Sequence, residues 1–231
     1  MEDFINFDDE DMSDLFAQSE DEYKIQKTRY MKPKAFRNIT QVKYKHADKF
    51  AEDIVKDVFN GDRIYSILAG NFIFGDIVEA LMDNDREQYI EELTLSTLSM
   101  SIENVGSLKN LLNFGCVGKI NLIISDYFFA HNRDIVKFMY EELDVDDKFS
   151  LAVAGTHTKI ILMRMRTGQK IVIHGSSNLR SSASLEQIMI ETDEGLYDFN
   201  YEWHESILNK YSTINKSIRG NALFEIVNKE D

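Results

Sequence analysis

The chain has 231 residues, 43% of them hydrophobic and 11% aromatic, which suffices for one domain with a substantial core. Its formal net charge of −14 argues against strong non-specific binding of nucleic acid by the whole surface. The single cysteine, Cys116, excludes an internal disulfide framework and cannot form a zinc site alone. The apolar runs are too short to cross a bilayer and the acidic N-terminus is unlike a signal peptide, so we expect a cytoplasmic protein without membrane association.

The charge is distributed unevenly near the N-terminus. Residues 1–22 hold ten acidic side chains and no basic one, which predicts a disordered tail. Apolar residues interrupt these acids, so the tail is also a candidate docking motif for a protein partner. Residues 23–49 hold nine Lys or Arg against one acid and form a basic arm. This arm either contacts nucleic acid or is covered by the acidic tail.

From about residue 50 the apolar spacing alternates between helical and extended periods, which predicts an α/β domain. The predicted elements in chain order are a helix at 47–59, a strand at 63–70, a helix at 74–82, a strand at 92–99, a helix at 102–113, a strand at 119–128, a helix at 134–143, strands at 149–154, 158–166, 169–174 and 185–191, and a helix at 196–207. We expect one domain at 50–211, built on a mostly parallel mixed sheet flanked by helices on both faces, with a loosely packed tail at 212–231.

Two short motifs carry the chemistry. His157 and Lys159 form an HxK motif at the start of one predicted strand, and residues 175–178 (GSSN) follow the next strand. Two residues apart on a strand, His157 and Lys159 are expected to face the same side. A neutral imidazole is a competent nucleophile, and the ammonium offsets the charge of a phosphate. Ser176 and Asn178 can donate hydrogen bonds to phosphoryl oxygens.

These motifs, in an alternating α/β frame, resemble the phospholipase D superfamily over roughly residues 50–210. The resemblance implies that His157 attacks phosphorus and forms a phosphohistidine, while Lys159 and Asn178 hold the non-bridging oxygens. It implies no metal and no cofactor. A second histidine, from another module, protonates the leaving oxygen. Because the chain has one HxK, the resemblance predicts a homodimer whose two sites face each other across a twofold axis.

The sequence departs from the family pattern in two places between its motifs. The family has an Asp five residues after the Lys, and here that position is Arg164. Fifteen residues separate Lys159 from Gly175, four more than in the family, and we expect a longer hairpin around Gly168 to contain them.

Several further side chains are candidates for the site. Glu186 is the first candidate, and Glu191 the second, for the family's acid that orients the nucleophilic histidine. The alternative for Glu186 is an ordinary exposed acid. Arg180 is a candidate for binding a second phosphate, although a surface ion pair is the commoner role. His174 is interpreted mainly as a packing or rim residue.

The sequence therefore predicts a metal-independent phosphodiesterase, a hydrolase of the phospholipase D-like nuclease type, acting on DNA or RNA through His157. The alternative is a weak or inactive module with the same fold that binds nucleic acid or protein. Arg164 and the acidic surface favour this alternative, as does the position of Glu186 and Glu191, neither of which has the family's usual spacing. The two hypotheses differ in whether substitution of His157 or deletion of residues 1–50 removes the function.

Overall fold

The computed structural model of the chain describes residues 58–61, 63–68, 74–84, 87–180 and 186–212. The predicted acidic tail, the basic arm, most of the helix at 47–59 and the C-terminal tail lie outside these residues. The elements, in chain order, are η1 (Val58–Asn60), β1 (Ile64–Leu68), α4 (Asp76–Asn84), β2 (Ile90–Thr97), α5 (Ile102–Asn113), β3 (Ile120–Ser125), α6 (Asp126–His131), α7 (Arg133–Leu143), β4 (Phe149–Ala154), β5 (Ile160–Met165), β6 (Lys170–Gly175), β7 (Glu186–Glu191) and α8 (Glu194–Tyr211).

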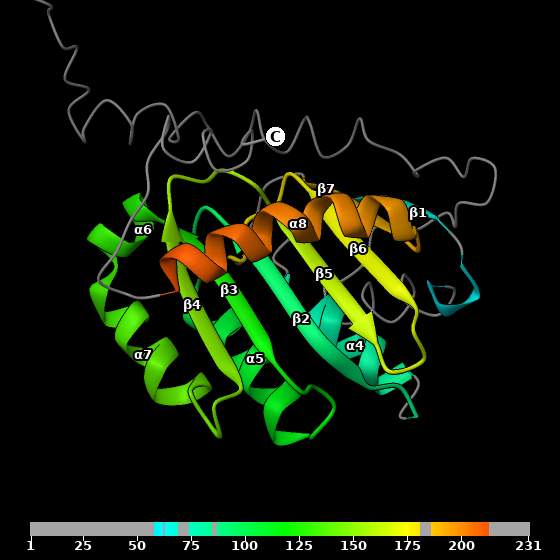
Figure 1. Ribbon diagram of the computed structural model, residues 1–231, viewed down its shortest axis with the longest axis horizontal. Helices are drawn as coiled ribbons and strands as arrows, with labels where there is room; N and C mark the ends of the chain where they lie inside the picture. Colours follow the sequence, from blue (N-terminus) through cyan, green and yellow to red (C-terminus); the bar gives the residue numbers. More distant parts are fainter. Residues whose placement is uncertain (1–57, 62, 69–73, 85–86, 181–185, 213–231) are drawn as a thin grey trace, which may run out of the picture.

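The seven strands form one mixed sheet in the order β1-β7-β6-β5-β2-β3-β4 (Figure 1). β2, β3 and β4 pair in parallel, and the other four neighbouring pairs are antiparallel. Only β5 and β7 oppose the direction shared by the other five strands. The predicted α/β class is confirmed. Parallel pairing is confined to the β2-β3-β4 half of the sheet.

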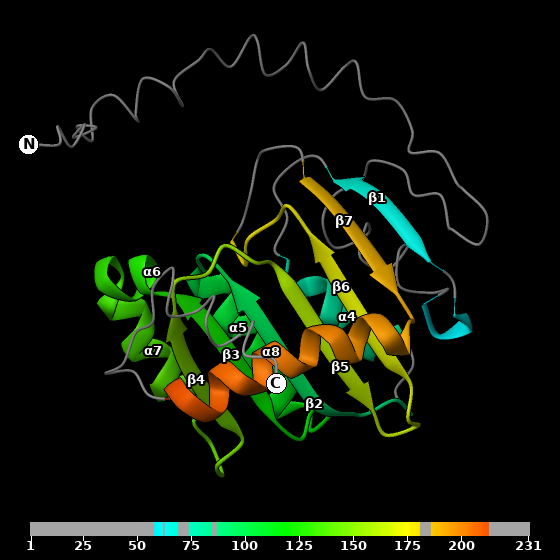
Figure 2. The same ribbon diagram turned by 45° about the horizontal axis from the view of Figure 1, so that its top comes forward.

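Helices cover both faces of this sheet, as predicted (Figures 1 and 2). Helix α8 crosses one face, and α4, α5 and α7 lie on the other. Side chains alternate along a strand, so Leu122 and Ile124 of β3 join the main core, whereas Ile123 packs under α8 with Ile207. Burial of both faces explains why consecutive residues of β3, Leu122, Ile123 and Ile124, are all apolar. None of the helices within the described ranges is long and apolar enough to span a bilayer.

The strand predicted at 119–128 ends earlier than expected, at Ser125. The Ser125 side chain accepts a hydrogen bond from the Phe128 backbone N–H at 2.9 Å and caps the short helix α6. Serine is a favoured N-cap residue because its oxygen satisfies one of the free N–H groups in the first helical turn. The aromatic residues after Ser125 therefore continue as helix.

Helix α8 contains a histidine that is fully buried, His204. Its Nδ1 lies 2.6 Å from the Asn200 carbonyl oxygen, so Nδ1 carries the hydrogen in the neutral ring. The other ring nitrogen, Nε2, is buried and has no hydrogen-bond partner among the described residues. Burial lowers the pKa of His204 from 6.5 to about 4 because the charged ring would lose its hydration.

We expect acidification to destabilise the protein through His204. Between pH 6.5 and about 4 the unfolded chain binds a proton that the folded chain does not bind, so the free energy of unfolding decreases as the pH decreases. The shift corresponds to a loss of up to about 3 kcal/mol. The measurement is urea unfolding at several pH values. His204→Leu should flatten this dependence, whereas substitution of the exposed His131 by Gln should preserve it. An unchanged slope in His204→Leu contradicts the prediction.

Candidate functional site

The two predicted motifs meet at one end of the sheet. Residues 155–159 connect β4 to β5, and Figure 1 shows this connection arching past the ends of β3 and β2. Because β5 is antiparallel to β2, its first residue lies at the edge where β2, β3, β4 and β6 have their carboxyl ends. The HxK motif therefore lies at the edge of the sheet where α/β proteins place their sites, although it precedes its own strand.

The hairpin of β5 and β6 brings the second motif to the first. Ile160 lies opposite His174, and the Gly175 backbone N–H donates to the Lys159 carbonyl oxygen at 3.4 Å. The hairpin turns at the far end, where Gly168 has a φ of 87°, a conformation that favours glycine. The additional residues between the motifs thus lie in this hairpin.

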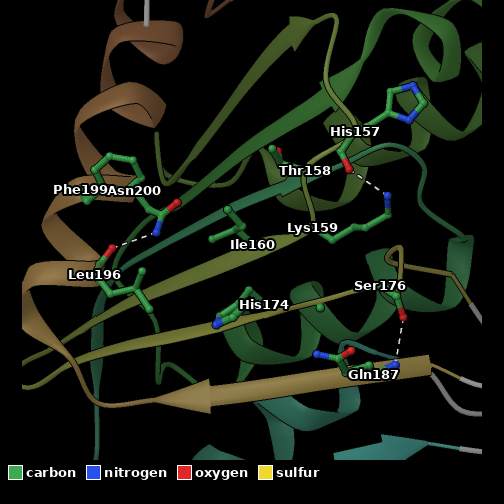
Figure 3. A pocket seen from close by; sticks show the side chains of 11 residues that line it. His157, Thr158, Lys159, Ile160, His174, Ser176, Gln187, Leu196, Phe199 and Asn200 are labelled. Carbon is green, nitrogen blue, oxygen red and sulfur yellow. Dashed lines mark hydrogen bonds between the residues drawn. The ribbon is translucent and has the colours of Figure 1, made fainter. Parts of the chain in front are cut away.

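A pocket of about 700 Å³ opens at this end of the sheet, on the face covered by α8 (Figure 3). The polar residues of the motif region that line it from the sheet side include His157, Lys159, His174 and Ser176. Leu196 and Phe199 of α8 line the opposite wall, and the Phe199 side chain is exposed. The pocket therefore has a cationic and hydroxyl-bearing wall and an apolar wall.

The orientation of the HxK side chains differs from the expectation. β5 begins at Ile160, so His157 and Lys159 lie in the connection and do not share a strand face. The Lys159 ammonium donates to the His157 carbonyl oxygen at 2.8 Å, and the His157 ring is directed away from the ammonium (Figure 3). The prediction of two side chains on one strand face is wrong because the strand starts after them. His157 itself is exposed.

A chain of hydroxyl groups fixes this connection to the sheet. Thr158 Oγ1 donates to Ser96 Oγ of β2 at 2.9 Å and lies 2.8 Å from Thr156 Oγ1. The Thr158 backbone N–H also donates to Thr156 Oγ1 at 3.2 Å. These bonds hold the backbone of His157 above the end of β2, while its side chain remains accessible.

The GSSN segment is only partly directed to the pocket. Ser176 Oγ donates to the Glu186 carboxylate and accepts from the Gln187 backbone N–H at 2.9 Å. Asn178 is not among the residues that line the pocket, and its Oδ1 is buried without a hydrogen-bond partner in the described part of the chain. The exposed Arg180 does not line the pocket either.

The two candidate glutamates contact other residues than His157. Glu186 accepts from Ser176, and Glu191 contacts Nε2 of His174 through its Oε1 at 3.1 Å. The other oxygen of Glu191 pairs with Arg63 Nε at 2.5 Å. Sequence reasoning missed this Arg63-Glu191-His174 arrangement, because it depends on the register of β6, β7 and β1, which the apolar pattern does not specify.

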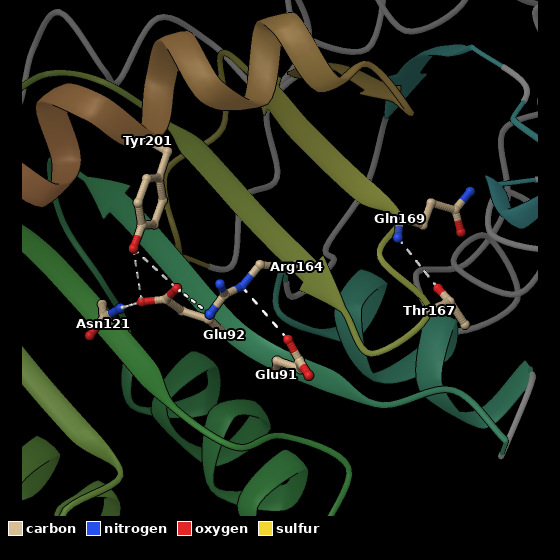
Figure 4. Close-up of polar contacts among 7 residues, drawn as sticks. All are labelled: Glu91, Glu92, Asn121, Arg164, Thr167, Gln169 and Tyr201. Carbon is tan, nitrogen blue, oxygen red and sulfur yellow. Dashed lines mark hydrogen bonds and ion pairs between the residues drawn. The ribbon is translucent and has the colours of Figure 1, made fainter.

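Arg164, at the position of the family's Asp, lies at the opposite end of β5 from the pocket (Figure 4). Its guanidinium pairs with the buried Glu92 carboxylate at 3.1 Å and, more loosely, with Glu91 at 3.9 Å. Asn121 Nδ2 and the Tyr201 hydroxyl donate to Glu92 at 2.7 and 3.2 Å. Burial and the Glu92 carboxylate raise the pKa of Tyr201 to about 12, so its hydroxyl stays a donor. Arg164 belongs to this network beneath α8.

In the described segments, no group of three or more His, Cys, Asp or Glu is arranged to hold a metal ion. The polar groups that line the pocket include two imidazoles, an ammonium, the hydroxyls of Thr158 and Ser176, and the amides of Gln187 and Asn200. Such a set can bind a phosphate, attack it and transfer protons.

No family model and no curated protein matches the chain. Solved structures that match part of it include a phosphatidylserine synthase from Haemophilus influenzae Rd KW20 (TM-score 0.43, 10% identity), a polyphosphate kinase from Porphyromonas gingivalis (0.40, 14%) and the yeast tyrosyl-DNA phosphodiesterase (0.34, 11%). The matches cover 66%, 66% and 55% of this chain but only 39%, 26% and 31% of those proteins. All three neighbours belong to the phospholipase D superfamily.

Proposed function

We propose that the protein is a metal-independent phosphodiesterase, with a nucleic acid as its substrate class. The observation that carries this proposal is the pocket in which His157, Lys159, His174 and Ser176 converge from two separate segments. His157 is exposed in a connection whose backbone is anchored, so rotation about its side-chain bonds suffices to bring the imidazole to a bound phosphate. The Lys159 ammonium then exchanges a carbonyl partner for a phosphoryl oxygen.

In this mechanism a His157 nitrogen attacks phosphorus and displaces the leaving oxygen, and water then hydrolyses the phosphohistidine. Lys159 stabilises the charge on the phosphoryl oxygens in both transition states. Ser176 offers its hydroxyl from the sheet side of the pocket once it is released from Glu186. Asn178, which the resemblance assigns to phosphate binding, requires a movement of the GSSN segment to reach the pocket.

The experiment is hydrolysis of bis(p-nitrophenyl) phosphate and of plasmid DNA in excess EDTA. We expect cleavage by the wild type and a loss of at least about 1,000-fold in His157→Ala, because the nucleophile is removed. The matched control is His131→Gln, which replaces an exposed histidine outside the pocket. Cleavage that EDTA abolishes, or that persists in His157→Ala, contradicts the proposal.

A specific observation favours the second candidate, a binding module without catalysis. Lys159 is engaged by a main-chain carbonyl, the His157 ring is directed away, and Asn178 does not line the pocket. Such a module binds phosphate or protein but leaves both test substrates intact. It keeps its partner in His157→Ala and loses it when residues 1–50 are removed, which is the opposite of the enzyme.

The resemblance offers one source for the second histidine of the reaction, the predicted homodimer. In it, two copies of the site face each other, and His157 of each copy protonates the leaving group at the other. Light scattering over a range of protein concentrations measures the oligomeric state. A monomer with full specific activity removes the dimer from the mechanism without affecting the role of His157 as nucleophile.

A further inference from the structure

We propose that His174, positioned by Glu191 and Arg63, is the proton-transferring histidine of the site, so that one chain holds both histidines of the reaction. This inference rests on the proposed phosphodiesterase function and deepens it. It assigns to a residue outside the HxK motif the role that the homodimer would otherwise give to a second copy of His157.

His174 lies in the same pocket as the HxK motif. It is the next-to-last residue of β6 and lies opposite Ile160 of β5, directly after the HxK segment. Its ring is on the α8 side of the sheet and lines the pocket that His157, Lys159 and Ser176 also line (Figure 3). Its side chain is 35% exposed, enough to contact a ligand.

Glu191 holds the neutral His174 ring in one tautomer. A carboxylate only accepts hydrogen bonds, so the 3.1 Å contact with Glu191 requires the hydrogen on Nε2 of His174. Nδ1 makes no hydrogen bond to any described residue and remains available to bind or release a proton. Fixing a tautomer in this way is what an orienting carboxylate contributes to a catalytic histidine.

The Glu191 carboxylate is itself held in place by Arg63. The Glu191 side chain is only 9% exposed, and Arg63 holds its second oxygen at 2.5 Å. Arg63, which immediately precedes β1, thus joins Glu191 of β7 and His174 of β6 in one chain of contacts. A histidine that served only to fill the rim needs no such support.

The proposed reaction has two steps. A His157 nitrogen forms a bond to phosphorus, the bond from phosphorus to the leaving oxygen breaks, and that oxygen takes the proton from Nδ1 of the charged His174. Neutral His174 then takes a proton from water at Nδ1. The hydroxide oxygen bonds to phosphorus, the phosphorus–nitrogen bond to His157 breaks, and the product leaves as a phosphomonoester with His174 charged again.

The test uses the full-length chain and leaving groups of different basicity. p-Nitrophenolate leaves without a proton, whereas the alkoxide of a dinucleotide requires one. In His174→Gln we expect about a 100-fold loss of dinucleotide cleavage, because general acid catalysis contributes on this scale. The first-turnover burst of p-nitrophenolate should remain within about fivefold of wild type. The burst should be followed by slow turnover and an accumulated phosphohistidine.

Two further variants separate a catalytic role from a structural one. Glu191→Gln should show the same dependence on the leaving group, with Glu191→Asp retaining more activity, and adding it to His174→Gln should cause little additional loss. Free imidazole should restore dinucleotide cleavage in His174→Ala. Equal losses for both leaving groups, or no rescue by imidazole, overturn the role of His174. Activity that persists in His157→Ala instead overturns the proposed function itself.

The oligomeric readout completes the test. We expect the specific activity to be independent of protein concentration. A mixture of His157→Ala with His174→Gln should cleave the dinucleotide no faster than His174→Gln alone, because both histidines lie within one chain. Restored activity in this mixture shows that the histidines come from different chains and overturns the inference.

Discussion

Substitution of Gly175 by alanine should destabilise the protein by about 3 kcal/mol or more, because a Cβ at this position overlaps the backbone of β7. The Cβ would overlap the Gln187 carbonyl oxygen and lie 3.0 Å from both the Gln187 carbonyl carbon and the Ile188 Cα. Backbone atoms cannot rotate away as a flexible side chain can. The substitution therefore forces β6 and β7 apart at the point where Ser176 N–H donates to the Gln187 carbonyl.

Urea unfolding of Gly175→Ala measures this effect, and Gly106→Ala is the matched control. Gly106 lies within α5, and an added Cβ there meets nothing within 4 Å. Alanine is the better helix former, so this control should gain up to about 1 kcal/mol. Equal effects at the two glycines would show that β7 does not approach Gly175 as closely as the structure has it. The close approach also explains the glycine of the GSSN segment without any reference to phosphate.

Replacing Arg164 by aspartate, the residue that the resemblance leads one to expect, should destabilise the protein by about 3 kcal/mol. The buried Glu92 carboxylate would lose its cation and gain a second carboxylate as neighbour, with Glu91 also close. Removing one partner of a fully buried ion pair costs about 3–5 kcal/mol. The lower end applies here because the Arg164 side chain is 47% exposed and water screens its charge.

A double-mutant cycle identifies the cause of this loss. Glu92→Gln combined with Arg164→Asp should recover part of the stability, because the amide removes the repulsion between the two carboxylates. Arg166→Asp is the control. Arg166 is exposed and stacks on Tyr89 at 3.7 Å, so its loss should cost no more than about 1 kcal/mol. A variant Arg164→Asp that is as stable as wild type contradicts the role assigned to Glu92.

Much of the fold follows from local sequence patterns, and particular residues show why. The helix at 102–113 and the strand at 149–154 were predicted at their observed bounds. Apolar periodicity indicates both elements, and the turn at Gly115 marks the end of the helix. The strand predicted from residue 158 starts at Ile160, since the Thr158 side chain bonds Ser96 of the neighbouring strand β2, which is far away in the sequence. A tertiary hydrogen bond of this kind leaves no trace in local periodicity.

The candidate site was predictable in composition but not in its contacts. His157, Lys159 and Ser176 do line one pocket, because a hairpin returns the chain to its starting edge. The partners of Glu186 and Glu191 follow from strand register. Moving a strand by one residue turns all its side chains to the other face, and nothing in a single sequence excludes that movement.

The connection from β4 to β5 is short for the distance that it spans. It must pass the ends of β3 and β2, a distance of three strand spacings or about 14 Å. Residues 155–159 provide six Cα–Cα steps, which reach about 21 Å when fully extended, and part of that reach is used in rising over the strand ends. The opposite end of the β5-β6 hairpin is open, so residues added in pairs there leave Lys159 facing Gly175. Insertions and deletions should therefore accumulate beside Gly168, while the interval between Ala154 and Ile160 stays constant in length.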